Sequence, residues 1–276
     1  MRGALVQLTS GDDPAANLSE TTEYIAQAAK GGARFILTPE VTNCVSASRT
    51  RQTEVLQSQN EDQTLAALRA QAAELQIWLL IGSLALKTDD PDGRFANRSF
   101  MIDPSGEIAA WYDKIHMFDV QVNAQETYRE SAGYRPGERA VIARTDFGPV
   151  GMTVCYDIRF PHLYQALAQA GARILTVPSA FSPVTGAAHW ESLLRARAIE
   201  TGCYVLAPAQ TGTHSATRGR QRKTYGHSMA ISPWGEVLID GGTERGIHFF
   251  EWDDRKVDDA RHKVPSLSHL RPFEDP

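Results

Sequence analysis

Two strings of residues each occur twice in this chain, in the same order and at similar offsets. Residues 32–39 (GARFILTP) return as residues 171–178 (GARILTVP), and residues 99–107 (SFMIDPSGE) return as residues 228–236 (SMAISPWGE). The first string follows an Ala-rich helical pattern in both copies, and the second places Pro-x-Gly between extended runs, which indicates a hairpin turn. The repetition predicts two structurally related halves.

Helical and extended patterns alternate along the first half. Residues 4–8 and 34–38 predict strands, whereas residues 14–30 and 63–75 predict helices. Such alternation is typical of α/β layers. Together with the repeat, it predicts two helix-covered sheets that pack sheet against sheet. We expect one domain over residues 1–276, because no linker rich in Pro, Gly or Ser separates the halves.

The bulk composition excludes several classes of protein. The chain has 276 residues, 42% of them hydrophobic, and its 28 basic and 33 acidic residues give a net charge of −5. That balance attracts neither nucleic acid nor an anionic membrane. No apolar stretch approaches the roughly 20 residues that span a bilayer, and the N-terminus lacks the pattern of a signal peptide. We expect a cytoplasmic protein whose cysteines, Cys44, Cys155 and Cys203, are reduced.

Cys155 is the strongest single candidate for chemistry. It follows the apolar run 149–154 and precedes a segment that leads into the helical pattern 162–169. A cysteine between a strand and a helix lies on a sharp turn near backbone N–H groups, which favour its thiolate and can bind an oxyanion. The position equally suits an inert buried cysteine.

Glu40 and Lys114 strengthen this interpretation. Glu40 ends an apolar strand, where α/β folds place catalytic groups, and a partly desolvated carboxylate has a raised pKa that lets it take a proton from a thiol. Lys114 lies among aromatic residues and would supply a cation that stabilises an oxyanion and depresses the thiol pKa. Each residue taken alone also fits a structural role, Glu40 as a helix cap or loop acid and Lys114 as a surface charge.

The segments around these three residues resemble, in order and spacing, the signature blocks of the nitrilase, or carbon–nitrogen hydrolase, superfamily. They are residues 39–40 (PE), 112–116 (YDKIH) and 154–161 (VCYDIRFP). The resemblance covers essentially the whole chain and implies a four-layer α-β-β-α sandwich that forms homodimers or higher homo-oligomers. The C-terminal tail, about residues 255–276, is expected to extend over a partner subunit.

The resemblance also implies a mechanism. Glu40 would act as the base and Cys155 as the nucleophile that forms a thioester. Lys114 and the backbone N–H of Tyr156 would hold the oxyanion. A second glutamate between the lysine and cysteine blocks would hold the lysine, and Glu130 stands at the matching position. Glu126 and Glu138 are the alternatives to Glu130.

Within the superfamily, the C-terminal half is most similar to the deaminated glutathione amidase branch. The similar segments include residues 178–181 (PSAF), 185–191 (TGAAHWE) and 194–200 (LRARAIE). The resemblance implies hydrolysis of deaminated glutathione to 2-oxoglutarate and cysteinylglycine. The alternatives are α-ketoglutaramate, an N-carbamoyl amino acid or a nitrile as substrate. A non-catalytic scaffold is disfavoured, because none of the three residues is missing.

An anionic amide substrate needs cationic partners. Arg159, four residues after Cys155, is the first candidate to contact a substrate carboxylate, and an ion pair with Asp157 or another acid is the alternative. Phe181, Thr185 and His189 are expected to line the pocket, without a proton-transfer role for His189.

Three further features receive structural interpretations. The basic run at residues 213–223 is predicted to be a mobile, solvated loop, with substrate steering as the alternative. Cys44 is expected to be a buried thiol close to Glu40. The eight histidines form no ligand cluster and no glycine-rich phosphate loop is present, so neither a metal nor another cofactor is predicted.

Overall fold

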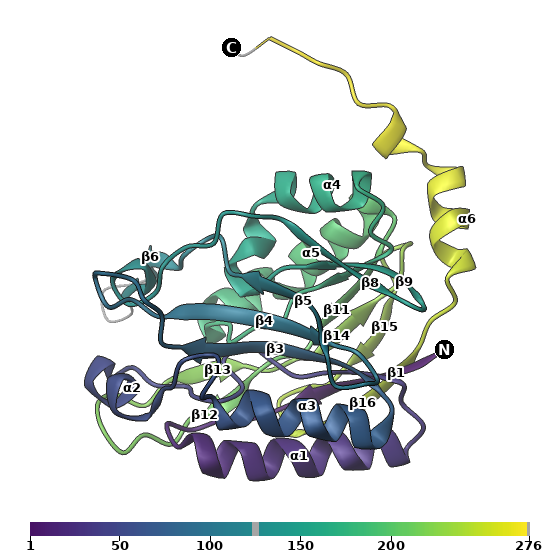
Figure 1. The fold of residues 1–276 in the computed structure, drawn as a ribbon. Coiled ribbons are helices and arrows are strands. Elements are labelled where there is room, and N and C mark those ends of the chain that lie inside the picture. Colours follow the sequence, from purple (N-terminus) through teal and green to yellow (C-terminus); the bar gives the residue numbers. More distant parts are fainter. Residues whose placement is uncertain (123–126, 275–276) are drawn as a thin grey trace.

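A computed structural model describes residues 1–122 and 127–274 of the chain. Two six-stranded sheets pack face to face, and helices cover both outer faces (Figure 1). The first sheet has the order β16 (Gly246–Glu251), β1 (Arg2–Gln7), β2 (Phe35–Leu37), β3 (Trp78–Leu86), β4 (Ala96–Ile102), β5 (Ile108–Asp113). The second has the order β15 (Val237–Asp240), β14 (Met229–Ile231), β11 (Tyr204–Ala207), β10 (Ile174–Thr176), β9 (Gly148–Met152), β8 (Val141–Thr145).

The helices form the outer layers. On the first sheet lie α1 (Pro14–Lys30) and α3 (Gln63–Leu75), and on the second lie α4 (Pro161–Gln169) and α5 (Pro183–Thr201). Smaller elements join these layers. They are α2 (Arg49–Val55), α6 (Arg255–Lys263), the 3-10 turns η1 (Glu130–Ala132), η2 (Cys155–Arg159) and η3 (Ser266–Ser268), and the ribbons β6 (Asp119–Gln121) with β7 (Thr127–Arg129) and β12 (Thr211–Thr213) with β13 (Lys223–Tyr225).

Apolar residues on successive positions of the central strands enter two different core layers. Leu37 of β2 lies in the same apolar cluster as Met152 of β9, which fills the space between the sheets. Its neighbour Ile36 packs with Ile25 of α1 and Leu68 of α3. Because side chains alternate along a strand, the continuous apolar run of β2 serves both layers at once, as expected for parallel strands buried on both faces.

The strand orders confirm the two predicted halves. The order β16-β1-β2-β3-β4-β5 corresponds to β8-β9-β10-β11-β14-β15, and in both sheets the central three strands are parallel. The second repeated string forms the same turn twice, with Gly106 and Gly235 both at φ 83°, a conformation that favours glycine. The chain thus has the predicted α-β-β-α sandwich.

The helix boundaries follow from local capping. Asp13 accepts hydrogen bonds from the N–H groups at the start of α1, and Asp62 caps α3 in the same way. Pro14 occupies the first turn of α1, where its missing N–H costs no hydrogen bond. Both helices therefore span the predicted residues, whereas β1 and β2 differ from the predicted strands by one or two residues at their ends.

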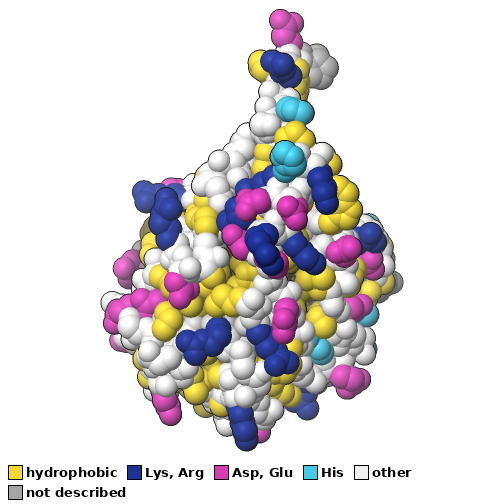
Figure 2. Space-filling view, turned by 90° about the vertical axis from the view of Figure 1, so that its right-hand side faces the viewer, with side chains coloured by type: hydrophobic (Ala, Val, Ile, Leu, Met, Phe, Trp, Pro, Cys, Tyr) yellow, Lys and Arg dark blue, Asp and Glu magenta, His cyan; other side chains and the backbone are white. Residues whose placement is uncertain are grey.

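The C-terminal segment leaves the body of the molecule after α6. Figures 1 and 2 show it standing away from the two sheets. Its apolar side chains are exposed, with Leu270 at 45% and Phe273 at 86% of their full accessible surface. Within the described part of the chain, no helix combines the length and apolarity needed to cross a bilayer.

Candidate active site

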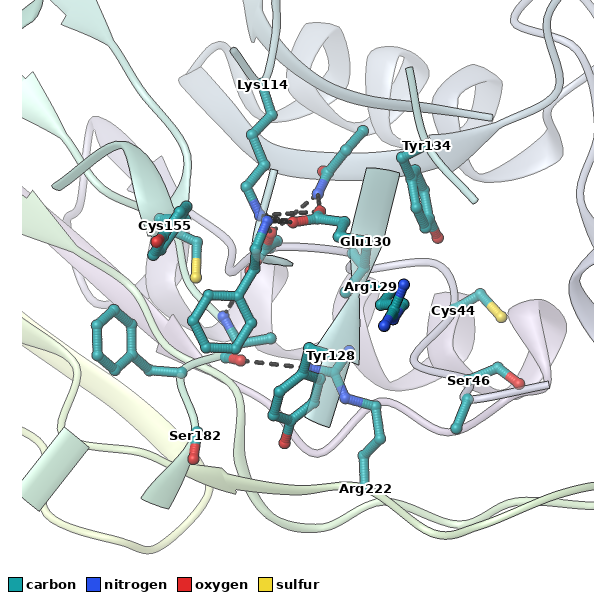
Figure 3. A pocket seen from close by; sticks show the side chains of 18 of the residues that line it. Cys44, Ser46, Lys114, Tyr128, Arg129, Glu130, Tyr134, Cys155, Ser182 and Arg222 are labelled. Carbon is teal, nitrogen blue, oxygen red and sulfur yellow. Dashed lines mark hydrogen bonds and ion pairs between the residues drawn. The ribbon is translucent and has the colours of Figure 1, made fainter. Parts of the chain in front are cut away.

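A cavity of about 270 Å³ opens where the ends of several strands meet, and Glu40, Lys114, Glu130 and Cys155 all line it (Figure 3). Glu40 lies three residues after β2, Lys114 directly after β5, and Cys155 three residues after β9. The structure therefore brings together four predicted site residues from both halves. Other lining residues include Cys44, Asn97, Phe118, Arg129, Tyr134, Tyr156, Ala180, Phe181, Thr185, Arg220 and Arg222.

Cys155 lies on a strained turn. Its φ of 49° is in the left-handed region, which is uncommon for a residue with a side chain and concentrates at functional sites. Its backbone N–H donates to the Pro178 carbonyl at 3.0 Å, and the preceding Val154 N–H donates to Asp157 Oδ2 at 2.8 Å. These bonds hold Cys155, which is 7% exposed, at the cavity wall. The adjacent Tyr156 N–H makes no hydrogen bond with any described residue.

Lys114 bridges the two glutamates. Its Nζ lies 2.9 Å from Glu40 Oε1 and 2.9 and 2.8 Å from the two Glu130 oxygens. Lys114 is 2% exposed and Glu40 4%, so these charges are almost completely removed from solvent. The Phe118 N–H donates to Glu130 Oε2 at 2.6 Å and fixes that carboxylate from the other side. Buried charges at this density are tolerated only when each is paired and hydrogen-bonded.

Asn97 of β4 is a site residue that the sequence prediction missed. Its Nδ2 donates to Glu40 Oε1 at 2.9 Å and to Glu130 Oε1 at 3.3 Å, so one amide orients both carboxylates. The Ala180 N–H, also missed, donates to Glu40 Oε2 at 2.8 Å. The sequence does not single Asn97 out, because the polar residues Arg98 and Ser99 follow it directly in the same strand.

The pKa of Glu40 moves in the direction opposite to the prediction. Burial alone would raise it, but the Lys114 charge and hydrogen bonds from Lys114 and Asn97 hold the pKa of this carboxyl below its usual range. Burial would likewise lower the pKa of Lys114, and the Glu130 and Glu40 charges instead raise it well above its usual value. Glu40 is therefore a carboxylate and Lys114 an ammonium at neutral pH.

The pKa of the Cys155 thiol is also not lowered as predicted. Burial and the Glu40 charge raise the pKa of Cys155, and Lys114 offsets only part of that effect. A protonated thiol and an ionised carboxylate thus line the same cavity. This arrangement suits proton transfer from thiol to carboxylate during attack, rather than a preformed thiolate.

The predicted substrate-binding residues divide into two pairs. Phe181 and Thr185 line the cavity, whereas Arg159 and His189 are absent from the described lining residues. Arg159 Nη2 instead lies 3.3 Å from His189 Nδ1, and its guanidinium carbon is 5.5 Å from the centre of the Phe181 ring. No ion pair joins Arg159 to Asp157 or to another described acid.

The basic loop differs from its predicted solvated state. Its ends form the ribbon β12–β13, and the Thr217 N–H and hydroxyl both bond Asp12 Oδ2, at 2.7 and 2.9 Å. Arg220 and Arg222 both line the cavity. Arg220 is exposed, as predicted, whereas Arg222 is half-buried, so the prediction of a solvated side chain is wrong for Arg222. Arg218 is exposed, as expected, and pairs with Glu54 at 2.8 Å.

The remaining predicted residues are placed as follows. Cys44 is buried and lines the cavity, and burial with the nearby Asp12 charge raises its pKa to about 12. Glu138 is exposed and does not line the cavity, whereas Glu126 lies outside the described residues. Among the residues that the structure describes, no three His, Cys, Asp or Glu side chains are grouped to hold a metal ion.

Comparisons with known proteins agree with this architecture. The sequence model of the family described as "Carbon-nitrogen hydrolase" matches residues 2–261. The Deaminated glutathione amidase of Yersinia enterocolitica is 39% identical over 97% of this chain and 92% of its own length. The chain therefore belongs to the carbon–nitrogen hydrolase family. Its fold, family and relatives make it an amidohydrolase.

Two solved structures extend the comparison. The C. elegans NitFhit protein superposes with a TM-score of 0.89 at 33% identity, covering 98% of this chain and 65% of that one. A mutant of the amidase from Nesterenkonia sp. AN1 superposes with a TM-score of 0.77 at 25% identity, covering 96% of this chain and 95% of that one. In that structure the acetamide moiety of fluoroacetamide is attached covalently at the active-site cysteine.

Proposed function

We propose that the chain hydrolyses a linear, non-peptide amide through a thioester on Cys155. One observation carries this proposal: Cys155 lines the same cavity as Glu40 and Lys114, and Lys114 Nζ lies 2.9 Å from Glu40 Oε1. The covalent adduct at the active-site cysteine of the Nesterenkonia amidase supports the same role for the cysteine here.

The reaction follows from the geometry. Glu40 takes the thiol proton as Cys155 sulfur attacks the amide carbon, and the oxygen of the tetrahedral intermediate is stabilised by Lys114 and the Tyr156 N–H. The carbon–nitrogen bond then breaks, and Glu40 returns the proton to the departing nitrogen. Water adds to the thioester with Glu40 as the base, which releases the carboxylic acid and restores the thiol. Glu130 holds Lys114 in place throughout.

The substrate we propose is deaminated glutathione, cleaved to 2-oxoglutarate and cysteinylglycine. The name of the 39% identical Yersinia relative supports this choice. The cavity supports it as well, because its lining includes three arginine side chains that suit an anionic ligand. Phe181 and Thr185, which also line the cavity, are proposed to contact the substrate, and Arg159 to contact it from beyond the Phe181 ring.

A substrate panel tests this assignment. Purified protein is incubated with deaminated glutathione, α-ketoglutaramate, an N-carbamoyl amino acid and a nitrile, and 2-oxoglutarate, ammonia and carbon dioxide are measured. We expect the highest kcat/KM with deaminated glutathione. Carbon dioxide release would point to the carbamoyl substrate, and a higher kcat/KM for α-ketoglutaramate would replace the proposed substrate with that smaller amide.

We further infer a single-domain protein of the cytoplasm that forms at least a homodimer, whose C-terminal tail covers a partner subunit. The exposed Leu270 and Phe273 on a segment that leaves the body support the tail contact. The free cysteines, Cys44, Cys155 and Cys203, suit a reducing compartment. Analytical ultracentrifugation of the full chain and of a chain ending at residue 263 tests the assembly. An unchanged number of subunits and an unchanged dissociation constant after truncation would contradict the tail contact.

A further inference from the structure

Arg222 reaches the cavity from the basic loop. Its Nη2 lies 3.4 Å from the Ala180 carbonyl oxygen (Figure 3). The N–H of the same residue, Ala180, donates to Glu40. Its guanidinium also lies 5.9 Å from the centre of the Tyr128 ring, which lines the same cavity. One residue of backbone therefore separates Arg222 from the proposed catalytic base.

The Nε atom of Arg222 is buried and has no hydrogen-bond partner among the described residues. The Oγ1 atom of Thr185, another lining residue, is in the same state. A buried polar group without a partner is destabilising, so native proteins rarely keep one without reason. A ligand with acceptor oxygens at this position would satisfy the guanidinium.

Charge is distributed unevenly along the cavity. The inner end holds Lys114 with two carboxylates, Glu40 and Glu130, and these side chains are nearly or largely buried. Arg129 and Arg220, which are exposed, and the half-buried Arg222 line the outer part. A ligand carboxylate is repelled by the two glutamates and attracted by the arginines. An amide with a carboxylate must therefore place its neutral amide at Cys155 and its carboxylate toward the loop.

The loop holds Arg222 in position before any ligand binds. The Arg222 carbonyl accepts from the His214 N–H at 2.9 Å, and the His214 ring contacts the Ser10 carbonyl and Thr224 Oγ1, each at 2.7 Å. Burial and the Arg222 charge lower the pKa of His214 to about 4, so this ring is neutral at physiological pH. A neutral ring that is hydrogen-bonded through both of its nitrogens is a rigid support for Arg222.

We propose that Arg222 is the specificity-determining residue that binds a substrate carboxylate and restricts the enzyme to carboxylate-bearing amides. This inference rests on the proposed function for its catalytic readout. The planar guanidinium presents parallel N–H groups that match a carboxylate, which a single ammonium cannot do. Because the contact is present in both the ground state and the transition state, its loss is expected mainly in KM.

The kinetic test compares Arg222→Gln with Arg218→Gln, a matched control on the same loop whose side chain pairs with Glu54 away from the cavity. The substrates are deaminated glutathione, α-ketoglutaramate, which carries its carboxylate on the acyl side only, and a neutral straight-chain amide. We expect Arg222→Gln to lower the preference for the carboxylate-bearing amides over the neutral amide by about 10- to 100-fold, the loss of a charged hydrogen bond. Arg218→Gln should leave the preference unchanged.

Two further arms keep the test decisive. Arg222→Lys keeps the charge but loses the planar fork, so it should fall between the wild type and Arg222→Gln, with thermal melts confirming folding. Glutarate binding by calorimetry in Cys155→Ala protein, with and without Arg222→Gln, reports on the carboxylate contact without catalysis. An unchanged preference together with an unchanged glutarate affinity overturns the role of Arg222. Failure of the wild type on every amide would instead count against the proposed function.

Discussion

The two halves of the molecule share one strand order but carry different residues where equivalent strands end. After β2 the chain reads Thr38-Pro39-Glu40, and after β10 it reads Val177-Pro178-Ser179. Glu40 points its carboxylate into the cavity, whereas the Ser179 hydroxyl bonds the carbonyl of Val177 two residues back. The same position of the repeat thus carries a carboxylate that lines the cavity in one half and a hydroxyl that bonds the backbone in the other.

The same contrast holds in the repeated hairpin. Asn97 of β4 orients both carboxylates, and the corresponding position before β14 is Gly226, which has no side chain. The second half instead contributes Cys155 and the Ala180 N–H. In the proposed mechanism the first half therefore supplies the base and the cation, and the second supplies the nucleophile. The site exists only where the two sheets pack against each other.

Removing the base should have the largest effect on rate among the first-half residues. Glu40→Gln keeps the shape but cannot accept the thiol proton, so kcat/KM should fall by about 10²–10⁴-fold. Steady-state kinetics with the best substrate measures the loss, and a thermal melt checks that the variant is folded. A variant with near wild-type kcat/KM would remove Glu40 from the mechanism.

Removing the cation should affect both rate and stability. Lys114→Met takes an oxyanion donor away, which typically costs about 10²–10³ in rate. It also leaves the Glu40 and Glu130 carboxylates without their shared cation, and breaking such a buried arrangement costs about 3–5 kcal/mol. Urea unfolding and kcat together test this. Normal stability with lost activity would show that the two carboxylates do not depend on Lys114 in the fold.

The Glu40 charge also predicts how stability varies with pH. Its folded-state pKa is held below the ordinary value of 4.5, so its stabilising contribution is complete above that value and is lost as the pH falls through the folded pKa. Wild type should therefore lose more unfolding free energy than Glu40→Gln as the pH drops below 4.5. Parallel urea titrations across this range check it, and identical slopes for the two proteins would contradict the lowered pKa.

Substitution of Ser179, the counterpart of Glu40 in the second half, should have the smallest effect on rate and stability. Ser179→Ala removes a single hydroxyl that bonds a backbone carbonyl. We expect a loss of about 1 kcal/mol in unfolding free energy and little change in kcat/KM. Urea unfolding and kinetics, run beside Glu40→Gln, measure the asymmetry. A rate loss comparable to that of Glu40→Gln would show that both strand ends take part in catalysis.

The frame was predictable because its causes are local. Repeated strings, Asp13 and Asp62 as helix caps and the turn glycines act within a few residues of the structure that they determine. Cys155 and Glu40 could be predicted from the sequence for the same reason, since each stands directly after a strand pattern. Lys114 had no comparable local signal and drew its support mainly from a resemblance.

The chemistry of the site was not predictable in full, because it depends on contacts far apart in the chain. Asn97 lies 57 residues from Glu40, and Ala180 lies 140 residues from it. The pKa of Glu40 was predicted with the wrong sign because Lys114, 74 residues away, reverses the effect of burial. Arg222 belongs to a loop that the sequence predicted to be solvated, and only the fold shows that it lines the cavity.

The central claim, that the second half supplies the nucleophile, is tested most directly by intact-protein and peptide mass spectrometry. Protein turning over deaminated glutathione is quenched in acid and analysed beside Cys155→Ala. We expect a 2-oxoglutaryl adduct on the peptide that contains Cys155, and a folded Cys155→Ala protein with neither adduct nor turnover. Turnover by Cys155→Ala, or an adduct on Cys44 in the same cavity instead, would contradict the account.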